Sequence, residues 1–359
     1  MTTDDPFLHW VGKTLDNPPP EPPVLIDNLM RAGELVVVAG PRGVSKSRLV
    51  FNLAGHLAYG DGVFLNCLAV HRRARTLILQ GELDPWASAR RWRAILGSDR
   101  PGGIAETFEP VRLRVREVRQ TRPGAGGSRT ETFHEGELDP RVEAWITEHG
   151  FDVLVLDPWA TFFAGNENSN DQVEAGLSQL RALALKHGTA IVVVHHLGKA
   201  NDYRDPEDLW RGASRLADWA STRVTMLPHY SAKAAADAGL TPQQARQYVD
   251  LHFLRRHEPL DDFSVHVDEA GIFSKWDPPA GDGGSARGRL TPDDVGRVAI
   301  ESGGFESIAD AARRLGVSDR AARQALERAV AAGVLVEVVP PGSTLKRYEL
   351  SDLYAEGTI

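Results

Sequence analysis

The chain has 359 residues, of which 42% are hydrophobic and 25% charged, and Cys67 is its one cysteine. This composition is typical of a globular protein of about two domains, excludes an internal disulfide and favours a reducing compartment. A net charge of −8 gives no support for nucleic-acid binding by the chain as a whole, so such binding would need local basic patches. No apolar run approaches the ~20 residues of a membrane helix, and the acidic N-terminus does not fit a signal peptide, so we expect a cytoplasmic protein without a membrane segment.

The N-terminal three-quarters of the chain has the pattern of an α/β domain. Residues 1–23 end in a proline-rich stretch and are expected to form a tether. In residues 24–276, apolar runs alternate with helical patterns, which predicts a mostly parallel sheet with helices on both faces. The expected strands are residues 34–39, 76–79, 153–156, 190–195 and 223–227. Their continuous Val, Ile and Leu character is typical of strands buried on both faces.

A glycine-rich turn follows the first expected strand and precedes an amphipathic segment. It consists of Gly40, Pro41, Arg42, Gly43, Val44, Ser45, Lys46, Ser47 and Arg48. This order predicts a phosphate-binding P-loop for ATP, in which backbone N–H groups hold the phosphates, Lys46 reaches the outer ones and Ser47 binds Mg²⁺. Ser45 replaces the glycine that the motif has before the lysine. Its side chain must fit beside a phosphate, so we expect weaker affinity or slower hydrolysis.

Glu82 follows the second expected strand and is the candidate catalytic base. A carboxylate at this position can accept a proton from the water that attacks the γ-phosphate. Asp84 could do the same, but it directly precedes Pro85, which favours a role at the start of the next helix.

Two further expected strands end in residues that could bind a metal ion or a phosphate. Asp157 ends the third strand, where its carboxylate can position Mg²⁺ through water. His195 and His196 end the fourth strand. Because adjacent strand residues point to opposite faces, the two histidines cannot easily share one metal ion. One of them is instead a candidate to hydrogen-bond the γ-phosphate.

Arg211 lies on a short turn of small residues, Gly212-Ala213-Ser214, before the last expected strand. A guanidinium presented in this way could cross a subunit interface and stabilise the transferred charge. A surface salt bridge is the alternative interpretation.

Two segments have the composition of insertions or linkers. Residues 112–129 are rich in arginine and end in glycines, which predicts an exposed, mobile insertion. Residues 277–289 read DPPAGDGGSARGR and form the clearest linker in the chain.

Residues 290–359 predict a small winged helix-turn-helix domain. Residues 305–315 and 318–332 have helical spacing, and residues 335–339 and 345–350 read as two strands around a Pro-Pro-Gly tip. Residues on one face of the second helix are candidates for DNA contacts: Arg320, Arg323, Gln324 and Arg328. Lys346 and Arg347 of the wing would suit phosphates. Nearby acidic residues nearly balance these charges, so a protein-docking role is the alternative.

The motifs together resemble the RecA-like ATPases of the RepA type, the hexameric replicative helicases of plasmids and phages. The resemblance covers roughly residues 24–276 and depends on the order of the P-loop, Glu82-Leu83-Asp84-Pro85, Asp157, His195-His196-Leu197-Gly198-Lys199 and Arg211-Gly212-Ala213-Ser214. It implies a homo-oligomer, expected to be a hexamer, that uses ATP and Mg²⁺ to move on DNA.

The resemblance also implies individual roles. Lys46 and Ser47 would bind phosphate and Mg²⁺, Glu82 would be the base, Asp157 the carboxylate beside Mg²⁺ and His196 the γ-phosphate sensor. Arg211 would act as an arginine finger in the neighbouring subunit, with Arg255 or Arg256 as a second basic residue across the interface. The loops after Asp157 and His196 would face a central channel, where Lys199 and Arg204 could contact single-stranded DNA.

Two other functions fit parts of the sequence. An ATP-dependent switch that controls DNA binding without unwinding would be consistent with Ser45. A monomeric small-molecule kinase would explain the P-loop but gives no reason for the winged helix or for Arg211. A dinucleotide enzyme is disfavoured because no G-x-G-x-x-G follows any expected strand.

Overall fold

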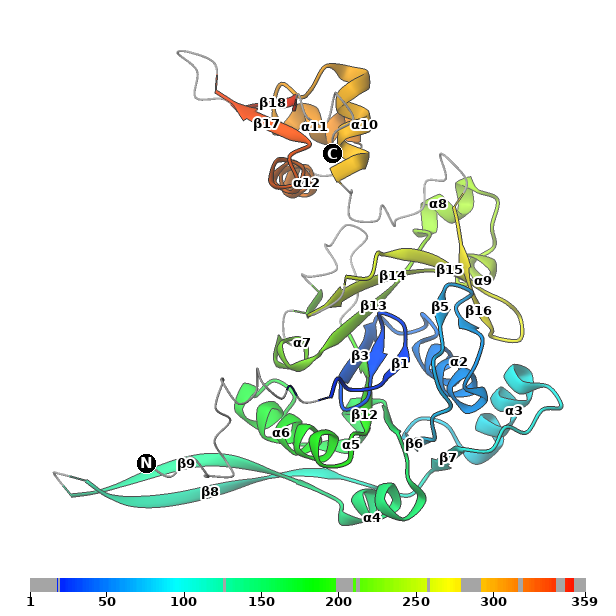
Figure 1. Cartoon of the computed structure of the whole chain (residues 1–359), viewed down its shortest axis with the longest axis vertical. Coiled ribbons are helices and arrows are strands. Elements are labelled where there is room, and N and C mark those ends of the chain that lie inside the picture. The colour runs from blue at the N-terminus through cyan, green and yellow to red at the C-terminus, as the bar shows by residue number, and fades with distance from the viewer. Residues whose placement is uncertain are drawn as a thin grey trace.

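The computed structural model describes residues 18–351 except residues 19, 125–126, 198–208, 211–213, 257–258, 279–291, 316–318 and 340–345. Its largest element is a nine-stranded sheet (Figure 1). In spatial order the strands are β16 (Phe273–Trp276), β15 (Phe263–Val267), β14 (Tyr248–Arg255), β13 (Thr222–Pro228), β3 (Leu35–Gly40), β12 (Ala190–His196), β10 (Val153–Asp157), β6 (Thr76–Gln80) and β7 (Ile104–Thr107). Neighbours from β13 to β7 run parallel, and those from β13 to β16 run antiparallel. The predicted α/β class with a mostly parallel sheet is confirmed.

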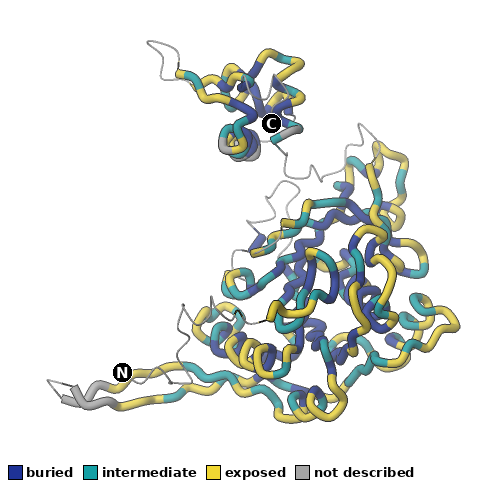
Figure 2. Tube along the Cα trace, viewed as in Figure 1, coloured by how far each residue is buried: buried dark blue, intermediate teal, exposed yellow. Residues whose placement is uncertain are grey.

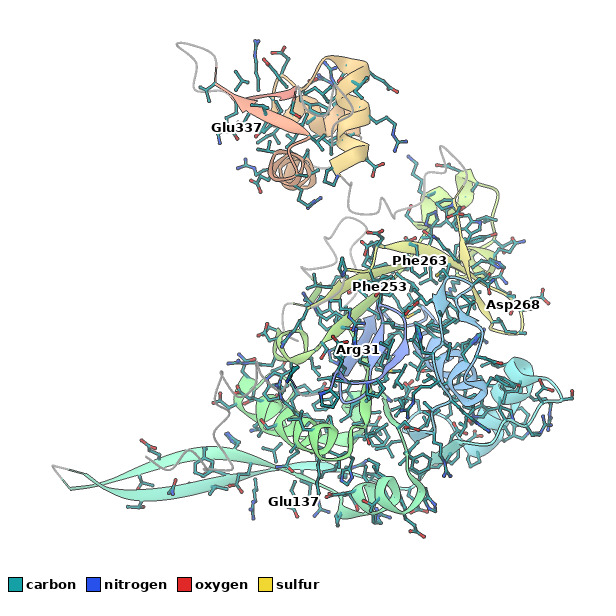
Figure 3. All side chains as sticks on the ribbon, viewed as in Figure 1. Arg31, Glu137, Phe253, Phe263, Asp268 and Glu337 are labelled. Carbon is teal, nitrogen blue, oxygen red and sulfur yellow. The ribbon has the colours of Figure 1, made fainter. Side chains whose placement is uncertain are left out.

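The five expected strands are all present, with ends that differ from the expectation by one residue. β6 and β10 are buried along their whole length, as their apolar middles, residues 77–79 and 153–156, predict for a sheet covered on both faces. The antiparallel strands are held by cross-strand packing as well as hydrogen bonds. Phe253 of β14 and Phe263 of β15, for example, bring their ring centroids within 5.1 Å (Figure 3).

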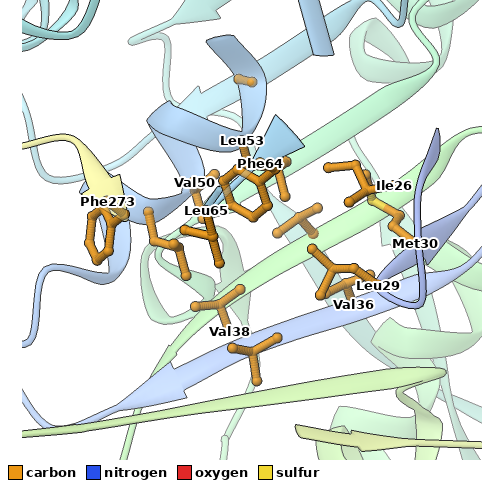
Figure 4. Close-up of a cluster of buried hydrophobic side chains, with 14 of the residues drawn as sticks. Ile26, Leu29, Met30, Val36, Val38, Val50, Leu53, Phe64, Leu65 and Phe273 are labelled. Atoms are coloured by element: carbon orange, nitrogen blue, oxygen red, sulfur yellow. The ribbon is translucent and has the colours of Figure 1, made fainter. Parts of the chain in front are cut away.

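Helices pack against both faces of the sheet. They are α2 (Lys46–Tyr59), α3 (Pro85–Leu96), α4 (Pro140–His149), α5 (Trp159–Phe162), α6 (Asn170–His187), α7 (Ser214–Trp219), α8 (Ala232–Asp237) and α9 (Pro242–Ala245). Because side chains alternate along a strand, Val36 and Val38 join the core that includes Leu53 of α2, and Val37 joins the core that includes Leu177 of α6. Figure 4 shows the first of these cores, and Figure 2 shows that the buried residues follow the central strands.

Short strand pairs lie beside the sheet. They are β1 (Val24–Ile26) with β2 (Met30–Arg31), and β4 (Val63–Phe64) with β5 (Leu68–Ala69). None of the helices in the described part of the chain combines the length and the apolar character needed to cross a bilayer.

The arginine-rich segment is exposed, as expected, but it is a regular β-ribbon rather than an irregular insertion. β8 (Leu113–Gly124) and β9 (Gly127–Leu138) pair antiparallel along their length and extend away from the sheet (Figure 1), and β11 (Phe163–Ala164) pairs with the base of β8. The register places Arg114 across from Glu137 and Arg116 across from Glu135, and Arg116 forms an ion pair with Glu135 at 2.8 Å. Such cross-strand pairs stabilise a ribbon, and the arginines alone did not indicate them.

The C-terminal part consists of three helices and a hairpin around a core of their own. They are α10 (Pro292–Ser302), α11 (Ile308–Leu315), α12 (Asp319–Ala331), β17 (Leu335–Val338) and β18 (Arg347–Leu350). The two expected helices and both expected strands are present, whereas α10 was not predicted. Gly333 has a φ of 76°, a left-handed conformation that suits glycine just after a helix. The winged-helix assignment and the domain boundaries stay predictions, and the linker falls largely outside the described residues.

Candidate nucleotide-binding site

Four neighbouring parallel strands bring the predicted site residues to one edge of the sheet. β3, β12, β10 and β6 are adjacent in that order, and each ends at this edge in a residue singled out from the sequence or in the loop that carries it. The carboxyl ends of parallel strands are where open α/β sheets bind ligands. The topology therefore brings together side chains that are far apart in the sequence.

The loop between β3 and α2, predicted to be a P-loop, has two left-handed positions. Gly43 has a φ of 89°. Ser45 has a φ of 65° and precedes the first residue of α2, without a side-chain hydrogen bond to cap the helix. The sequence expectation concerned only the space beside a phosphate, whereas the structure adds a backbone conformation that L-residues adopt at a cost. Gly40 is required for a different reason, because a Cβ there would collide with the carbonyl oxygen of Met226.

The Lys46 side chain folds back against the loop between β3 and α2. Its side chain is buried, and Nζ donates hydrogen bonds of 2.8 Å to the carbonyl oxygens of Gly40 and Pro41. Burial lowers the pKa of the Lys46 ammonium to about 8, against the opposing charges of Asp157 and Glu82. The ammonium is therefore mostly charged at neutral pH and is held by groups that a phosphate could replace.

The side chains of Ser47 and Asp157 contact each other. The Ser47 hydroxyl donates a hydrogen bond to Oδ1 of Asp157 at 3.1 Å. Asp157 is 1% exposed, and its Oδ2 has no hydrogen-bond partner among the described residues. Burial raises the pKa of this carboxyl to about 6.

These two oxygens fit a divalent cation bound together with a nucleotide. A buried carboxylate oxygen without a partner, beside a hydroxyl, is the oxygen donor set that Mg²⁺ takes in phosphate sites, where it keeps several waters. Within the described ranges no group of three or more His, Cys, Asp or Glu residues could hold a metal ion. A cation at this edge would therefore depend on phosphate oxygens for much of its coordination.

Glu82 lies across from His196, and the two side chains contact each other. Nε2 of His196 is 3.1 Å from Oε1 of Glu82, and the Glu82 side chain is 50% exposed. The Glu82 carboxylate is therefore open to solvent and touches the residue expected to sense the γ-phosphate. Asp84 accepts a hydrogen bond from the N–H of Ala87 and caps α3, which confirms the structural role expected for it.

His195 points away from this pair. It lines a small cavity with Trp159 and Glu167, on the other side of β12. Burial lowers the pKa of its imidazole to about 4, so the ring is neutral at physiological pH. The two histidines do not converge, in agreement with the strand alternation.

Arg91 belongs to the site and was missed from the sequence. It lies on α3, with its guanidinium 5.3 Å from the ring centroid of Phe51, and Nη1 is buried without a hydrogen-bond partner in the described structure. Burial lowers its pKa, and the negative charges of Asp157, Glu106 and Glu82 oppose that shift, which places the cation near all three. No sequence signal separates Arg91 from Arg90 and Arg93, the other arginines of α3, because only packing distinguishes them.

Several predicted residues lie outside this cluster. Arg211, Lys199 and Arg204 fall outside the described residues. Arg255 was expected to be able to cross a subunit interface, and the structure contradicts this. Its side chain is 1% exposed, and Nη2 lies 3.3 Å from Oε1 of Glu34. Arg256, the alternative, is exposed.

The predicted DNA contacts of the C-terminal part are only partly described. On α12, Arg323 is exposed and Arg328 half-buried, whereas the side chains of Arg320 and Gln324 are outside the described structure. The two wing cations are engaged within the chain. Lys346 pairs with Glu337 at 2.9 Å, and Arg347 pairs with Glu306 at 2.8 Å.

The fold and the loop thus define an α/β protein with a P-loop. The profile of one protein family, AAA_25, described as "AAA domain", matches residues 4–202, which is more than half of the chain. The chain belongs to this family of AAA domains.

Other comparisons give distant likenesses. The solved structure titled "ATPase Domain of G40P" is 10% identical with a TM-score of 0.47, over 69% of this chain and 86% of that one. The structure titled "The Structure Of A DnaB-Like Replicative Helicase And Its Interactions With Primase" is 10% identical with a TM-score of 0.46, over 68% of this chain and 58% of that one. At TM-scores below 0.5, neither likeness determines a function for this chain. No curated protein matches it.

Proposed function

We propose that this chain is a RecA-like ATPase that assembles as a ring, most simply a hexamer, and couples ATP hydrolysis to movement on DNA. The observation that supports this most is the convergence of Lys46, the Ser47–Asp157 pair and the Glu82–His196 pair at one sheet edge. A P-loop alone would fit many nucleotide-binding proteins. A base candidate and a sensor candidate beside it favour hydrolysis.

In the proposed ground state, Lys46 exchanges its bonds to the Gly40 and Pro41 carbonyls for the outer phosphates of ATP. The loop N–H groups and the start of α2 hold the same phosphates. Ser47 and Asp157 would hold Mg²⁺, which supplies positive charge to the phosphates when bound.

Hydrolysis then needs a base next to the attacking water. Glu82 takes a proton from the water, whose oxygen forms the new bond to the γ-phosphorus as the bond to the β,γ-bridging oxygen breaks, so that ADP and phosphate form. The contact with His196 holds the Glu82 carboxylate at the site before nucleotide binds. Arg91 adds a positive charge near Asp157 and Glu82.

We assign the remaining roles from the sequence resemblance. Arg211 of a neighbouring subunit would supply the arginine finger, and exposed Arg256 would be the second basic residue. Lys199 and Arg204 would contact single-stranded DNA in the channel, and Arg320, Arg323, Gln324 and Arg328 of a winged helix would contact a duplex. The type of protein that unites these roles is a RepA-like replicative helicase of a plasmid, phage or mobile element.

A second candidate function is an ATP-dependent switch that controls DNA binding and does not unwind DNA. The left-handed Ser45 favours it, because a constrained P-loop would slow turnover while still binding nucleotide. The ion pairs of Lys346 and Arg347 with glutamates within the chain also leave fewer free cations for a duplex.

Phosphate release by the full-length chain, with and without single-stranded DNA, tests the proposal. A motor is expected to hydrolyse ATP, to do so several-fold faster with DNA, and to displace a strand from a forked duplex. Hydrolysis without strand displacement would support the switch. Absence of any phosphate release under all conditions would contradict both the motor and the proposed catalytic roles.

A further inference from the structure

A small polar cavity lies behind the end of β12, on the opposite side from Glu82. Its volume is about 10 Å³, close to the space that one water molecule needs. Its lining comes from four elements and one connecting segment: Trp159 of α5, Glu167 of the segment before α6, Asn170 and Val173 of α6, His195 of β12, and Arg215 and Leu216 of α7.

Three of the residues that line this cavity each have a buried polar atom without a hydrogen-bond partner in the described structure. These atoms are Nε1 of Trp159, Oε1 of Glu167 and Nδ1 of His195. Trp159 is fully buried and stacks on Phe163 with ring centroids 4.6 Å apart, so its N–H cannot turn to solvent. A buried polar group without a partner costs about 1–3 kcal/mol, and three in one cavity are unlike the usual protein interior.

The segment that carries Glu167 is itself held in place. The N–H of Asn166 donates to Oε1 of Gln172 at 2.8 Å, and the N–H of Asn168 donates to Oδ1 of Asn166 at 3.0 Å. A Cβ at Gly165 would also crowd the ring of Phe163. Glu167 therefore reaches the cavity from a turn whose backbone is fixed on both sides.

We propose that this cavity binds one water molecule that joins Trp159, Glu167 and His195, and that Glu167 acts through it as a positioning residue for the end of β12. Water can accept from the indole N–H and donate to Oε1 of Glu167 and to Nδ1 of a neutral His195. That arrangement satisfies all three atoms with a single molecule, and His195 must then carry its proton on Nε2.

The network reaches the nucleotide site through the next residue. His195 and His196 are adjacent at the end of β12. His196 in turn contacts Glu82. Fixing His195 fixes the backbone that presents His196, and with it the orientation of the Glu82 carboxylate. This part of the inference rests on the proposed ATPase function, whereas the water site does not.

A crystal structure of the full-length chain tests the water site. The expected result is one ordered water within hydrogen-bond distance of Trp159 Nε1, Glu167 Oε1 and His195 Nδ1. A cavity that is filled by a protein side chain, or that shows no water while the three atoms stay in place, would overturn the site.

Steady-state ATP hydrolysis tests the positioning role. Glu167→Leu removes the acceptor and is expected to lower kcat about tenfold with KM within about twofold, because the P-loop is untouched. Glu167→Gln keeps an oxygen acceptor and should stay within about threefold of the parent. The matched control is Glu148→Leu, at an exposed glutamate at the end of α4.

Each outcome of these assays is decisive. Parental kcat in Glu167→Leu, or a joint rise in KM and loss of thermal stability, would overturn the positioning role. An inactive parent protein would instead contradict the proposed ATPase function, and the crystallographic result would then decide the water site alone.

Discussion

The hydroxyl of Ser47 donates a hydrogen bond to Oδ1 of Asp157, a residue 110 positions away in the chain. The bond joins the first turn of α2 to the end of β10. Because Oδ2 of Asp157 is left without a partner among the described residues, the pair has an unused acceptor aimed at the site. The sheet therefore pre-positions the oxygens that a cation would need.

Replacing Ser45 with glycine should stabilise the protein. A serine at a φ of 65° is strained, and glycine adopts this conformation freely, so we expect a gain of about 1 kcal/mol in the free energy of unfolding. Urea unfolding of the two proteins measures it. If the strain also slows the P-loop, the Ser45→Gly variant hydrolyses ATP faster.

The control for this change is Ser98→Gly, at an exposed serine whose φ is negative. There glycine only adds freedom to the unfolded chain and should lower stability by a few tenths of a kcal/mol, roughly. Equal effects at both positions would show that Ser45 is not strained.

Because His195 is buried and neutral, the free energy of unfolding should fall in mild acid. Burial lowers the pKa of its imidazole from 6.5 to about 4, so the folded state binds the proton less readily than the unfolded state. Its contribution is complete above pH 6.5 and is lost as the pH falls through about 4, with a total on the order of 3 kcal/mol. Urea unfolding at pH 7.5 and 4.5 should therefore show a smaller acid loss in His195→Gln than in the parent. Identical losses in the two proteins would rule out the buried neutral histidine.

Replacing Arg91 should lower the rate of ATP hydrolysis more than replacing its neighbour Arg90. Arg91→Met removes the charge near Asp157 and Glu82 but keeps an apolar stem beside Phe51, so we expect kcat to fall about tenfold without loss of folding. Arg90→Met is the matched control, because Arg90 lies over the ring of Trp86, which is 71% exposed. Steady-state ATP hydrolysis compares them. Similar rates in the two variants would remove Arg91 from the site.

The sheet could be predicted because its strands carry apolar runs, such as residues 153–156. The ribbon of β8 and β9 could not, because the pairing of residues such as Arg116 and Glu135 becomes visible only with the register. Local periodicity identifies elements that bury a face, and it does not identify elements held by cross-strand charge pairs.

The site was predictable where a motif or a strand end marked it, as for Lys46 and Asp157. The left-handed φ of Ser45 could not be predicted, because the identity of a residue does not determine its backbone angle. Arg91 was hidden among the arginines of α3, and only packing separates it from Arg90. The contact between Glu82 and His196 depends on the order of the strands, which the sequence left open.

The most direct test of the account is to measure ATP binding and phosphate release together for the parent, Glu82→Gln and Lys46→Ala. Glutamine cannot take the proton of water, so Glu82→Gln should bind ATP as the parent does and release no phosphate above background. Lys46→Ala loses a charge-assisted contact and should bind ATP more weakly by about 2–3 kcal/mol. Phosphate release by Glu82→Gln at the parental rate would contradict the proposed site.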